Sequence, residues 1–165
     1  MQTERMKIVI VGGVAAGSGA AARLRRLDEQ AEIILFERGA FISYANCGLP
    51  YHVGGAIPLR ESLLVMTPEK FAAWFRVDVR TEHEVLAIDR QARTVTVRTR
   101  GSDTLVESYD QLVLATGSSP VVLPLPGADD PRVQRLWTLP DMDDILARVK
   151  AGARRAAFEQ SWRDA

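Results

Sequence analysis

The feature that most constrains the fold is a β-branched run that leads directly into a glycine-rich turn. Residues 8–11 read IVIV, a pattern typical of a strand buried on both faces, and the next six residues read GGVAAG. From Ser18 onward, alanines, leucines and arginines favour a helix, and residues 32–36 form a second apolar run. The order strand, turn, helix, strand predicts a βαβ unit.

The glycine turn has the residues of a dinucleotide-binding loop. Gly12 permits the tight turn, Gly17 lets the helix lie close to the strand, and the first amides of the helix face a pyrophosphate. Val14 stands where the strict G-x-G-x-x-G spacing has its middle glycine, which predicts a less close approach of the backbone to the phosphate. Glu37 follows at the spacing of a carboxylate that binds the adenosine ribose hydroxyls. A glycine-rich turn without a ligand is the alternative interpretation.

The middle of the chain predicts one more helix and a small antiparallel sheet. Residues 67–70, TPEK, have the order of a helix start, with a threonine cap followed by proline, and this helix is expected to end near Phe75. Residues 77–99 alternate apolar and polar side chains over two or three strands, and residues 104–109 are expected to pair with residues 94–99. Such alternation predicts an antiparallel meander with one solvent-exposed face.

A second continuous apolar run, residues 112–115, predicts another strand of the central parallel sheet. It ends in a threonine-glycine turn, residues 116–117, and the carboxyl ends of parallel strands meet at one edge. We therefore expect this turn beside Gly12. A proline-rich connector, residues 120–131, then leads to a final helix that begins near Pro140. The predicted fold class is α/β and Rossmann-like, with a parallel central sheet, helices and a small antiparallel β-meander.

Composition and charge exclude several classes of protein. The chain has 165 residues, of which 47% are hydrophobic, and this is enough for one sizeable core. Its 21 basic and 21 acidic residues balance, so charge gives no reason to expect nucleic acid or a membrane surface as a partner. The N-terminal residues do not resemble a secretory signal, and no stretch reaches the roughly 18 apolar residues of a membrane span. We expect a cytoplasmic protein without a metal site.

The single cysteine, Cys47, lies in the segment SYANCGLPY, residues 43–51. A lone cysteine is most often an inert, buried thiol that behaves as a small hydrophobic residue. One cysteine excludes an intramolecular disulfide and suits a reducing compartment. The neighbouring asparagine, glycine and proline favour a loop over a core, so a reactive thiol is the competing interpretation.

Five segments match motifs of one known family: IVIVGGVAAGSGAAARLRRL, FERGAFISYANCGLPYHVGG, TPEKF, VRTEHEVLAID and YDQLVLATGSSP. Together they resemble the pyridine nucleotide-disulfide oxidoreductases that carry a single redox cysteine. Within that family the pattern is most similar to the coenzyme A-disulfide reductases, with NADH oxidases, NADH peroxidases and NADH-dependent persulfide reductases as relatives. The resemblance covers residues 7–156, and the segment around Cys47 is its most specific part.

This resemblance implies FAD as cofactor, NAD(P)H as co-substrate and a small thiol or disulfide of the coenzyme A type as substrate. Cys47 is then the expected catalytic nucleophile, which alternates between a thiolate and a mixed disulfide with coenzyme A. The implied cofactor-binding residues are Gly12, Gly13, Val14, Ala15, Ala16, Gly17, Glu37, Arg38, Asn46, Thr116 and Gly117. The implied substrate-binding residues are Arg26, Ser43, Asn46 and Lys70. For Arg26 and Lys70, a charge on an exposed helix face is the alternative.

The family pattern also predicts that the fold is incomplete in this chain. Residues 1–150 match the N-terminal part of an FAD-binding domain, and residues 151–165 are expected to be a divergent or disordered tail. The NADH-binding domain and the dimerisation domain through which the family forms homodimers are expected to be absent. The expected function is reduction of coenzyme A disulfide or a related thiol or persulfide. The alternatives are a truncated, inactive FAD- or nucleotide-binding fragment, and NADH oxidase or peroxidase chemistry through a Cys47 sulfenic acid.

Overall fold

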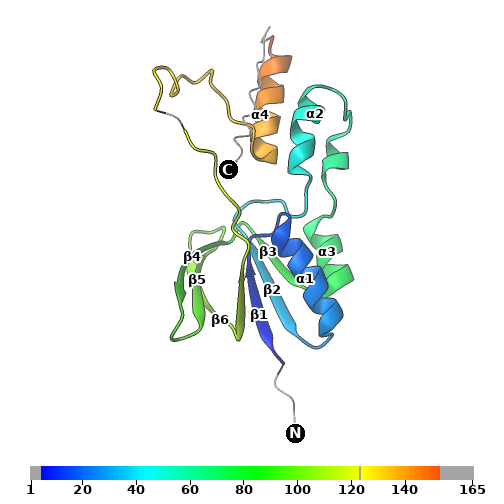
Figure 1. The fold of residues 1–165 in the computed structure, drawn as a ribbon, viewed down its shortest axis with the longest axis vertical. Helices are drawn as coiled ribbons and strands as arrows, with labels where there is room; N and C mark the ends of the chain where they lie inside the picture. Colours follow the sequence, from blue (N-terminus) through cyan, green and yellow to red (C-terminus); the bar gives the residue numbers. More distant parts are fainter. Residues whose placement is uncertain (1–4, 123, 153–165) are drawn as a thin grey trace, which may run out of the picture. The chain divides into compact units, whose positions relative to one another are not determined.

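A four-stranded parallel sheet forms the centre of the fold in a computed structural model, which describes residues 5–122 and 124–152. The strands lie in the order β3, β2, β1, β7 (Figure 1). Their bounds are Lys7–Val11 for β1, Glu32–Glu37 for β2, Asp78–Thr81 for β3 and Gln111–Leu114 for β7. Val9 of β1 lies opposite Ile34 of β2 and Leu112 of β7, and both Val9 and Ile34 are buried. The continuous apolar runs therefore form strands of the central parallel sheet, as predicted, with β1 and β2 inside it and β7 at one edge.

The chain divides into two compact units. The first contains the described residues up to Ala45 together with Arg60–Ser118, and the second contains Asn46–Leu59 and the described residues from Ser119 onward. The parallel sheet belongs entirely to the first unit. Each unit is built around its own buried apolar side chains.

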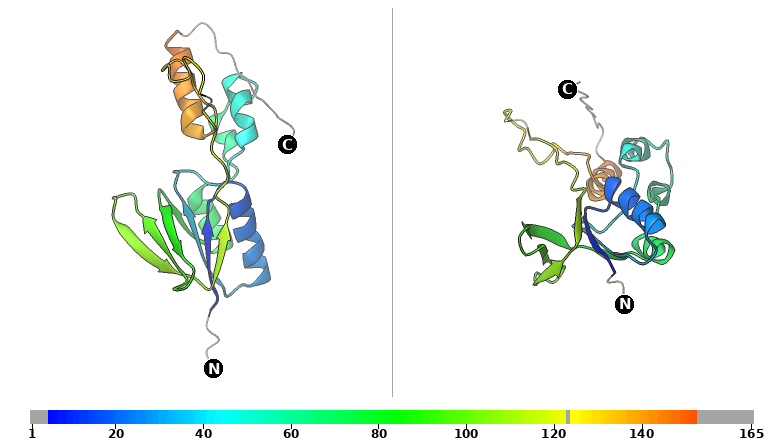
Figure 2. Two further views of the ribbon diagram at one scale, coloured as in Figure 1. Left: turned by 60° about the vertical axis from the view of Figure 1, so that its left-hand side comes forward. Right: turned by 60° about the horizontal axis from the view of Figure 1, so that its bottom comes forward.

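Two helices, α1 (Ala16–Leu27) and α3 (Pro68–Phe75), cover one face of the parallel sheet (Figure 2). Ala21 of α1 and Phe71 of α3 are buried and belong to one apolar cluster with Ile10 of β1. The alanine-rich start of α1 allows a close approach to the sheet, and α3 ends where the sequence predicts.

Arg25 connects the C-terminal ends of α1 and α3. Its buried guanidinium donates hydrogen bonds to the carbonyl oxygens of Phe75 at 2.8 Å and Arg76 at 2.7 Å, and to two carbonyl oxygens just beyond α1. Burial lowers the pKa of this guanidinium from its usual range, but an arginine keeps its charge. Arg23 and Arg26 are exposed, so the three arginines of α1 do not form one solvated face.

A three-stranded antiparallel meander covers the opposite face of the sheet. Its strands are β4 (Glu84–Asp89), β5 (Thr94–Arg98) and β6 (Thr104–Ser108). Val95 and Val97 of β5 are fully buried and pack with Phe36 of β2. The antiparallel pairing of β5 with β6 confirms the predicted hairpin.

The prediction of antiparallel strands throughout residues 77–99 is wrong for β3. This strand pairs in parallel with β2, with Ile34 opposite Asp78 and Glu37 opposite Thr81. The helical connection through α3 returns the chain to the same end of the sheet, which gives parallel strands. An edge strand of a parallel sheet and a strand of a meander both alternate when one face is covered, so the pattern alone does not separate them.

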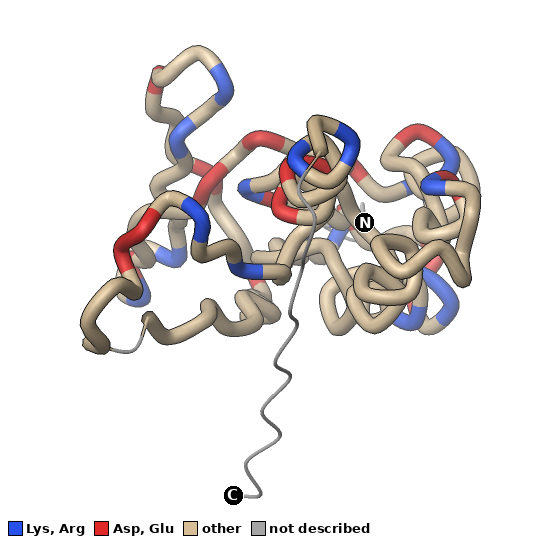
Figure 3. Tube along the Cα trace, turned by 90° about the horizontal axis from the view of Figure 1, so that it is seen from above, with Lys and Arg blue, Asp and Glu red and all other residues tan. Residues whose placement is uncertain are grey.

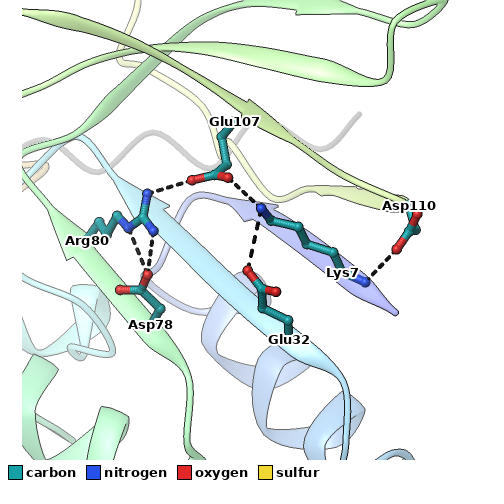
Figure 4. A network of polar contacts seen from close by, with 6 residues as sticks. All are labelled: Lys7, Glu32, Asp78, Arg80, Glu107 and Asp110. Carbon is teal, nitrogen blue, oxygen red and sulfur yellow. Dashed lines mark hydrogen bonds and ion pairs between the residues drawn. The ribbon is translucent and has the colours of Figure 1, made fainter. Parts of the chain in front are cut away.

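Charged side chains join the meander to the parallel sheet (Figure 4). Glu107 of β6 accepts hydrogen bonds from Lys7 Nζ at 2.6 Å and from an Arg80 guanidinium nitrogen at 2.7 Å. Burial raises the pKa of Glu107, but these two bonds outweigh burial and hold the pKa below its usual value. Arg80 also contacts Asp78 at 2.6 Å and lies over the ring of Phe36. This network fixes the meander on strands β1 and β3.

The second unit is helical. Its elements are a 3-10 turn, η1 (Asn46–Gly48), and the helices α2 (Leu49–Val53) and α4 (Leu139–Lys150), whereas a second 3-10 turn, η2 (Arg60–Leu63), belongs to the first unit. Leu49 of α2 and Met142 of α4 are buried, and the two helices contact each other. Thr138 and Asp141 form a capping box at the N-terminus of α4. The helix begins at Leu139, one residue before the predicted start at Pro140.

Basic and acidic residues are interspersed along the described trace (Figure 3). Within the described ranges, no helix combines the length and apolar character needed to cross a bilayer. The sequence predicts a divergent or disordered tail at residues 151–165. Residues 153–165 of this tail lie outside the described part of the chain.

Candidate functional site

The glycine turn after β1 is packed so closely that two of its positions exclude a side chain. Gly12 has a φ of +97°, and its N–H donates to the carbonyl oxygen of Phe36 at 2.8 Å. A Cβ atom on Gly12 would lie 2.2 Å from the carbonyl oxygen of Ala115, and one on Gly17 would lie 1.7 Å from the carbonyl oxygen of Gly12. Both separations are far below van der Waals contact. The tight turn and the close helix approach agree with the sequence prediction.

Val14 occupies the middle position of the loop without backbone strain. It is not among the described residues with positive φ, so its backbone conformation is one that valine adopts freely. Its N–H has no hydrogen-bond partner within the described part of the chain. The following helix α1 has no side-chain cap at Ala15 and no acidic residue in its first turn. The positive end of the helix is therefore open to an anionic group.

Glu37, at the end of β2, holds the loop with its carboxylate. Oε2 accepts a hydrogen bond from the Gly13 N–H at 2.8 Å, and Oε1 accepts one from the Gly39 N–H at 2.7 Å. These backbone partners were not anticipated by the sequence prediction, which assigns the carboxylate to ribose hydroxyls. A carboxylate has about four acceptor positions, so capacity for ligand hydroxyls remains.

The turn after β7 adjoins the glycine turn, as the parallel arrangement predicts. Gly12 faces the carbonyl group of Ala115, and the next residues, Thr116 and Gly117, are exposed. Gly117 has a φ of +66°, a conformation that favours glycine. Arg38 is exposed immediately after β2. These residues share the carboxyl edge of the sheet with the glycine loop, where open α/β sheets bind ligands.

Ser43 has an unusual backbone that is held from two sides. Its φ is +47°, which is uncommon for a residue other than glycine. The Ser43 N–H donates to the carbonyl oxygen of Gly13 at 3.0 Å, and the Ser43 carbonyl accepts from the Val65 N–H at 2.9 Å and from the Met66 N–H at 3.3 Å. The chain that follows β2 is thereby attached to the glycine loop.

Cys47 lies in the second unit, in the 3-10 turn before α2, and its thiol is free and exposed. The alternative that this thiol is buried is therefore wrong, and the reactivity of Cys47 stays a prediction. Asn46 is exposed beside it, whereas Leu49 is buried and anchors the turn. At the other end of α2, the His52 ring nitrogen Nδ1 lies 2.6 Å from the Ile57 carbonyl oxygen, a contact that stabilises the loop after the helix.

Arg26 and Lys70 lie exposed on α1 and α3. The Lys70 backbone N–H donates to the Thr67 hydroxyl at 3.3 Å, which confirms the predicted cap of α3. The Lys70 side chain lies on the surface. Of the predicted site residues, Asn46 and Cys47 belong to the second unit and all others to the first. Within the described ranges, no group of three or more histidine, cysteine, aspartate or glutamate side chains forms a metal-binding cluster.

Sequence reasoning missed two residues that shape this region. Ser18 is buried and donates a hydrogen bond to the Gly13 carbonyl oxygen, and Arg25 anchors the far end of α1. Neither carries a local signal, because a serine near a helix start and an arginine among three arginines are both common on exposed surfaces.

Comparison with known proteins places the chain among oxidoreductases. A family model described as pyridine nucleotide-disulphide oxidoreductase matches residues 6–157. The chain is 42% identical over 146 residues to the coenzyme A disulfide reductase of Staphylococcus aureus (strain JH9), and the match covers 88% of this chain and 33% of the reductase. The chain thus spans about a third of the length of the curated relatives it matches.

Solved structures agree with this assignment. The reduced CoADR-RHD of Bacillus anthracis superposes with a TM-score of 0.85 at 44% identity, over 88% of this chain and 27% of that chain. A NAD-dependent persulfide reductase from A. fulgidus gives a TM-score of 0.84 at 36% identity, over 89% of this chain and 28% of that chain. The water-forming NADH oxidase from Lactobacillus brevis gives a TM-score of 0.82 at 32% identity, over 88% of this chain and 32% of that chain. The chain, with its Rossmann-like sheet and glycine loop, belongs to the pyridine nucleotide-disulphide oxidoreductase family.

Proposed function

We propose that this chain is the FAD-binding and cysteine-bearing part of an NAD(P)H-dependent flavoenzyme that reduces coenzyme A disulfide or a related thiol or persulfide. The observation that carries the proposal is the exposed, free thiol of Cys47 in a chain that is 42% identical to a coenzyme A disulfide reductase. Residues 1–150 correspond in this proposal to the N-terminal part of the FAD-binding domain.

The carboxyl edge of the parallel sheet fits the adenosine diphosphate half of FAD. The amide of Val14 and the uncapped start of α1 offer donors and a positive dipole to a pyrophosphate. Glu37 retains acceptor capacity for the ribose hydroxyls, and the exposed Thr116 and Gly117 lie at the same edge. When bound, the flavin supplies the two electrons that the cysteine chemistry consumes.

Cys47 performs the first chemical step in this proposal. Its thiolate attacks one sulfur of coenzyme A disulfide, the substrate S–S bond breaks, and one coenzyme A leaves as its thiolate. The product is a mixed disulfide between Cys47 and the second coenzyme A. Two electrons and one proton then release this coenzyme A as a thiol and restore the Cys47 thiolate. The exposed position of Cys47 on a short turn gives the substrate sulfur access.

Charged and polar side chains then select the substrate. Asn46 is exposed next to Cys47 and is proposed to hydrogen-bond the bound thiol, as is Ser43. Arg26 and Lys70 are exposed cations that are proposed to bind the phosphates of coenzyme A. A substrate that lacks these phosphates should therefore react more slowly.

The mixed disulfide gives a direct test. The purified chain is incubated with coenzyme A disulfide, and the intact mass and the peptide that contains Cys47 are measured by mass spectrometry. We expect one coenzyme A adduct on Cys47, none on a Cys47→Ser variant, and slower modification by oxidised glutathione at the same concentration.

Other outcomes would change the proposal. Absence of the adduct at an accessible Cys47, shown by its alkylation with iodoacetamide, would contradict it. Conversion of Cys47 to a sulfenic acid under hydrogen peroxide, without reaction with coenzyme A disulfide, would instead favour the chemistry of the NADH oxidases and peroxidases. Lys70→Ala should slow modification by coenzyme A disulfide and leave modification by glutathione unchanged.

A further inference from the structure

The peptide group between Gly13 and Val14 is held from several directions by groups that lie far apart in the sequence. The Gly13 carbonyl oxygen accepts hydrogen bonds from the Ser18 hydroxyl and from the Ser43 N–H at 3.0 Å. The Gly13 N–H donates to Glu37 Oε2 at 2.8 Å. Both acceptor positions of the carbonyl oxygen are therefore occupied, and the only amide donor of Gly13 is paired.

These contacts fix the direction of the next amide. A trans peptide is planar, so the Val14 N–H points opposite to the Gly13 carbonyl group. Because Ser18 and Ser43 both donate to that carbonyl oxygen, the Val14 N–H points away from them. This N–H has no partner within the described residues. The hydrogen bonds of Gly13 thus aim a free donor before any ligand is present.

We propose that Ser18 is a positioning residue for the dinucleotide, which acts by orienting the Gly13–Val14 peptide so that the Val14 N–H meets the pyrophosphate. This inference rests on the proposed function of the loop as an FAD site. Ser18 itself is buried, with 5% of its surface exposed, and its hydroxyl donates to the loop at the Gly13 carbonyl oxygen. Its role is therefore indirect, through the Gly13 carbonyl oxygen.

Space around the peptide supports this role. A Cβ atom on Gly13 would lie 2.7 Å from Ile42 Cγ2 and 2.8 Å from Leu35 Cδ2, so the loop is pressed against apolar side chains on that side. Gly13 therefore lies close to these apolar side chains, and the hydroxyl of Ser18 donates to its carbonyl oxygen. The hydrogen bonds of the Gly13 N–H and carbonyl oxygen then determine the orientation of the peptide.

Ser18→Ala tests the proposal because it separates loop geometry from stability. Alanine is the best helix former, so the substitution gains helix propensity while it loses one hydrogen bond, and the urea midpoint should stay close to that of the unmodified chain. The dissociation constant for FAD, measured by quenching of flavin fluorescence, should rise about three- to tenfold, the value of one neutral hydrogen bond. Ser62→Ala, at an exposed position of η2, serves as the control and should change neither quantity.

A spectroscopic readout distinguishes positioning from a merely structural role. In the ligand-free chain, Ser18→Ala should move the amide resonance of Val14 in a nitrogen–proton correlation spectrum and leave the resonances of the meander in place. Unchanged FAD affinity in Ser18→Ala, or an affinity loss matched by a lower urea midpoint with Val14 unmoved, would overturn the inference. If the unmodified chain itself fails to bind FAD, the proposed function fails and the inference falls with it.

Discussion

Glu37→Gln is the substitution that most directly tests how the glycine loop is held. The carboxylate accepts two hydrogen bonds from backbone N–H groups, at 2.8 Å and 2.7 Å, in a buried position. Each bond of a charged acceptor contributes about 1.5–3 kcal/mol, and a neutral one contributes about 1 kcal/mol. Glutamine has one acceptor oxygen, so its NH₂ group would face the other backbone N–H and leave it unpaired. We expect a loss of about 2–5 kcal/mol in the free energy of unfolding.

Equilibrium unfolding in urea, followed by circular dichroism, measures this loss. The matched control is Glu32→Gln, at the other end of β2, where the carboxylate is 52% exposed and lies 3.5 Å from Lys7 Nζ. An exposed ion pair contributes at most about 1 kcal/mol, so the control should stay within that range. A Glu37→Gln variant as stable as the control would refute the conclusion that this carboxylate holds the loop.

Three further substitutions test other parts of the structure. Arg25→Met should lower the unfolding free energy by about 2–4 kcal/mol, because four carbonyl oxygens lose a charged donor, while the exposed Arg23→Met should change it by less than about 0.5 kcal/mol in the same urea experiment. Gly12→Ala should prevent folding, because its Cβ would lie 2.2 Å from a carbonyl oxygen. Gly19→Ala, in open space within α1, should instead raise the free energy of unfolding by about 0.5–1 kcal/mol. Circular dichroism distinguishes the two variants. The pKa of Glu107 is held below its ordinary 4.5, so its stabilisation is present above that pH and is lost as the pH falls through the lower folded value. Glu107→Gln should therefore flatten the fall of the thermal midpoint as the pH drops below 4.5, and an unchanged acid dependence would contradict the role of the network.

The sequence predicts those parts of the fold that depend on local patterns. The strand, glycine turn and helix around Gly12 follow from a β-branched run, a residue that tolerates positive φ and a stretch of helix formers. The cap of α3 at Thr67 and the start of α4 near Pro140 are also local signals. Each of these features depends on neighbours within a few residues.

Features that depend on distant partners were not predictable in the same way. The sheet to which β3 belongs is decided by its contact with β2, and alternation is the same in either sheet. Arg25 reaches carbonyl oxygens 50 residues away, and its neighbours Arg23 and Arg26 have the same side chain. The spacing of Glu37 predicts a carboxylate at the loop, but only the structure shows that backbone amides already bind it.

The position of β1 in the sheet has a consequence for how the chain is made. Val9 pairs with Ile34 on one side and with Leu112 on the other, and Lys7 bonds to Glu107 across 100 residues. On the ribosome, β1 emerges before β7, so one edge of β1 stays unpaired until residues 111–114 have been translated. Such long-range closure slows folding and exposes the nascent edge to wrong partners, so expression of this chain should benefit from chaperones that shield unfinished sheets.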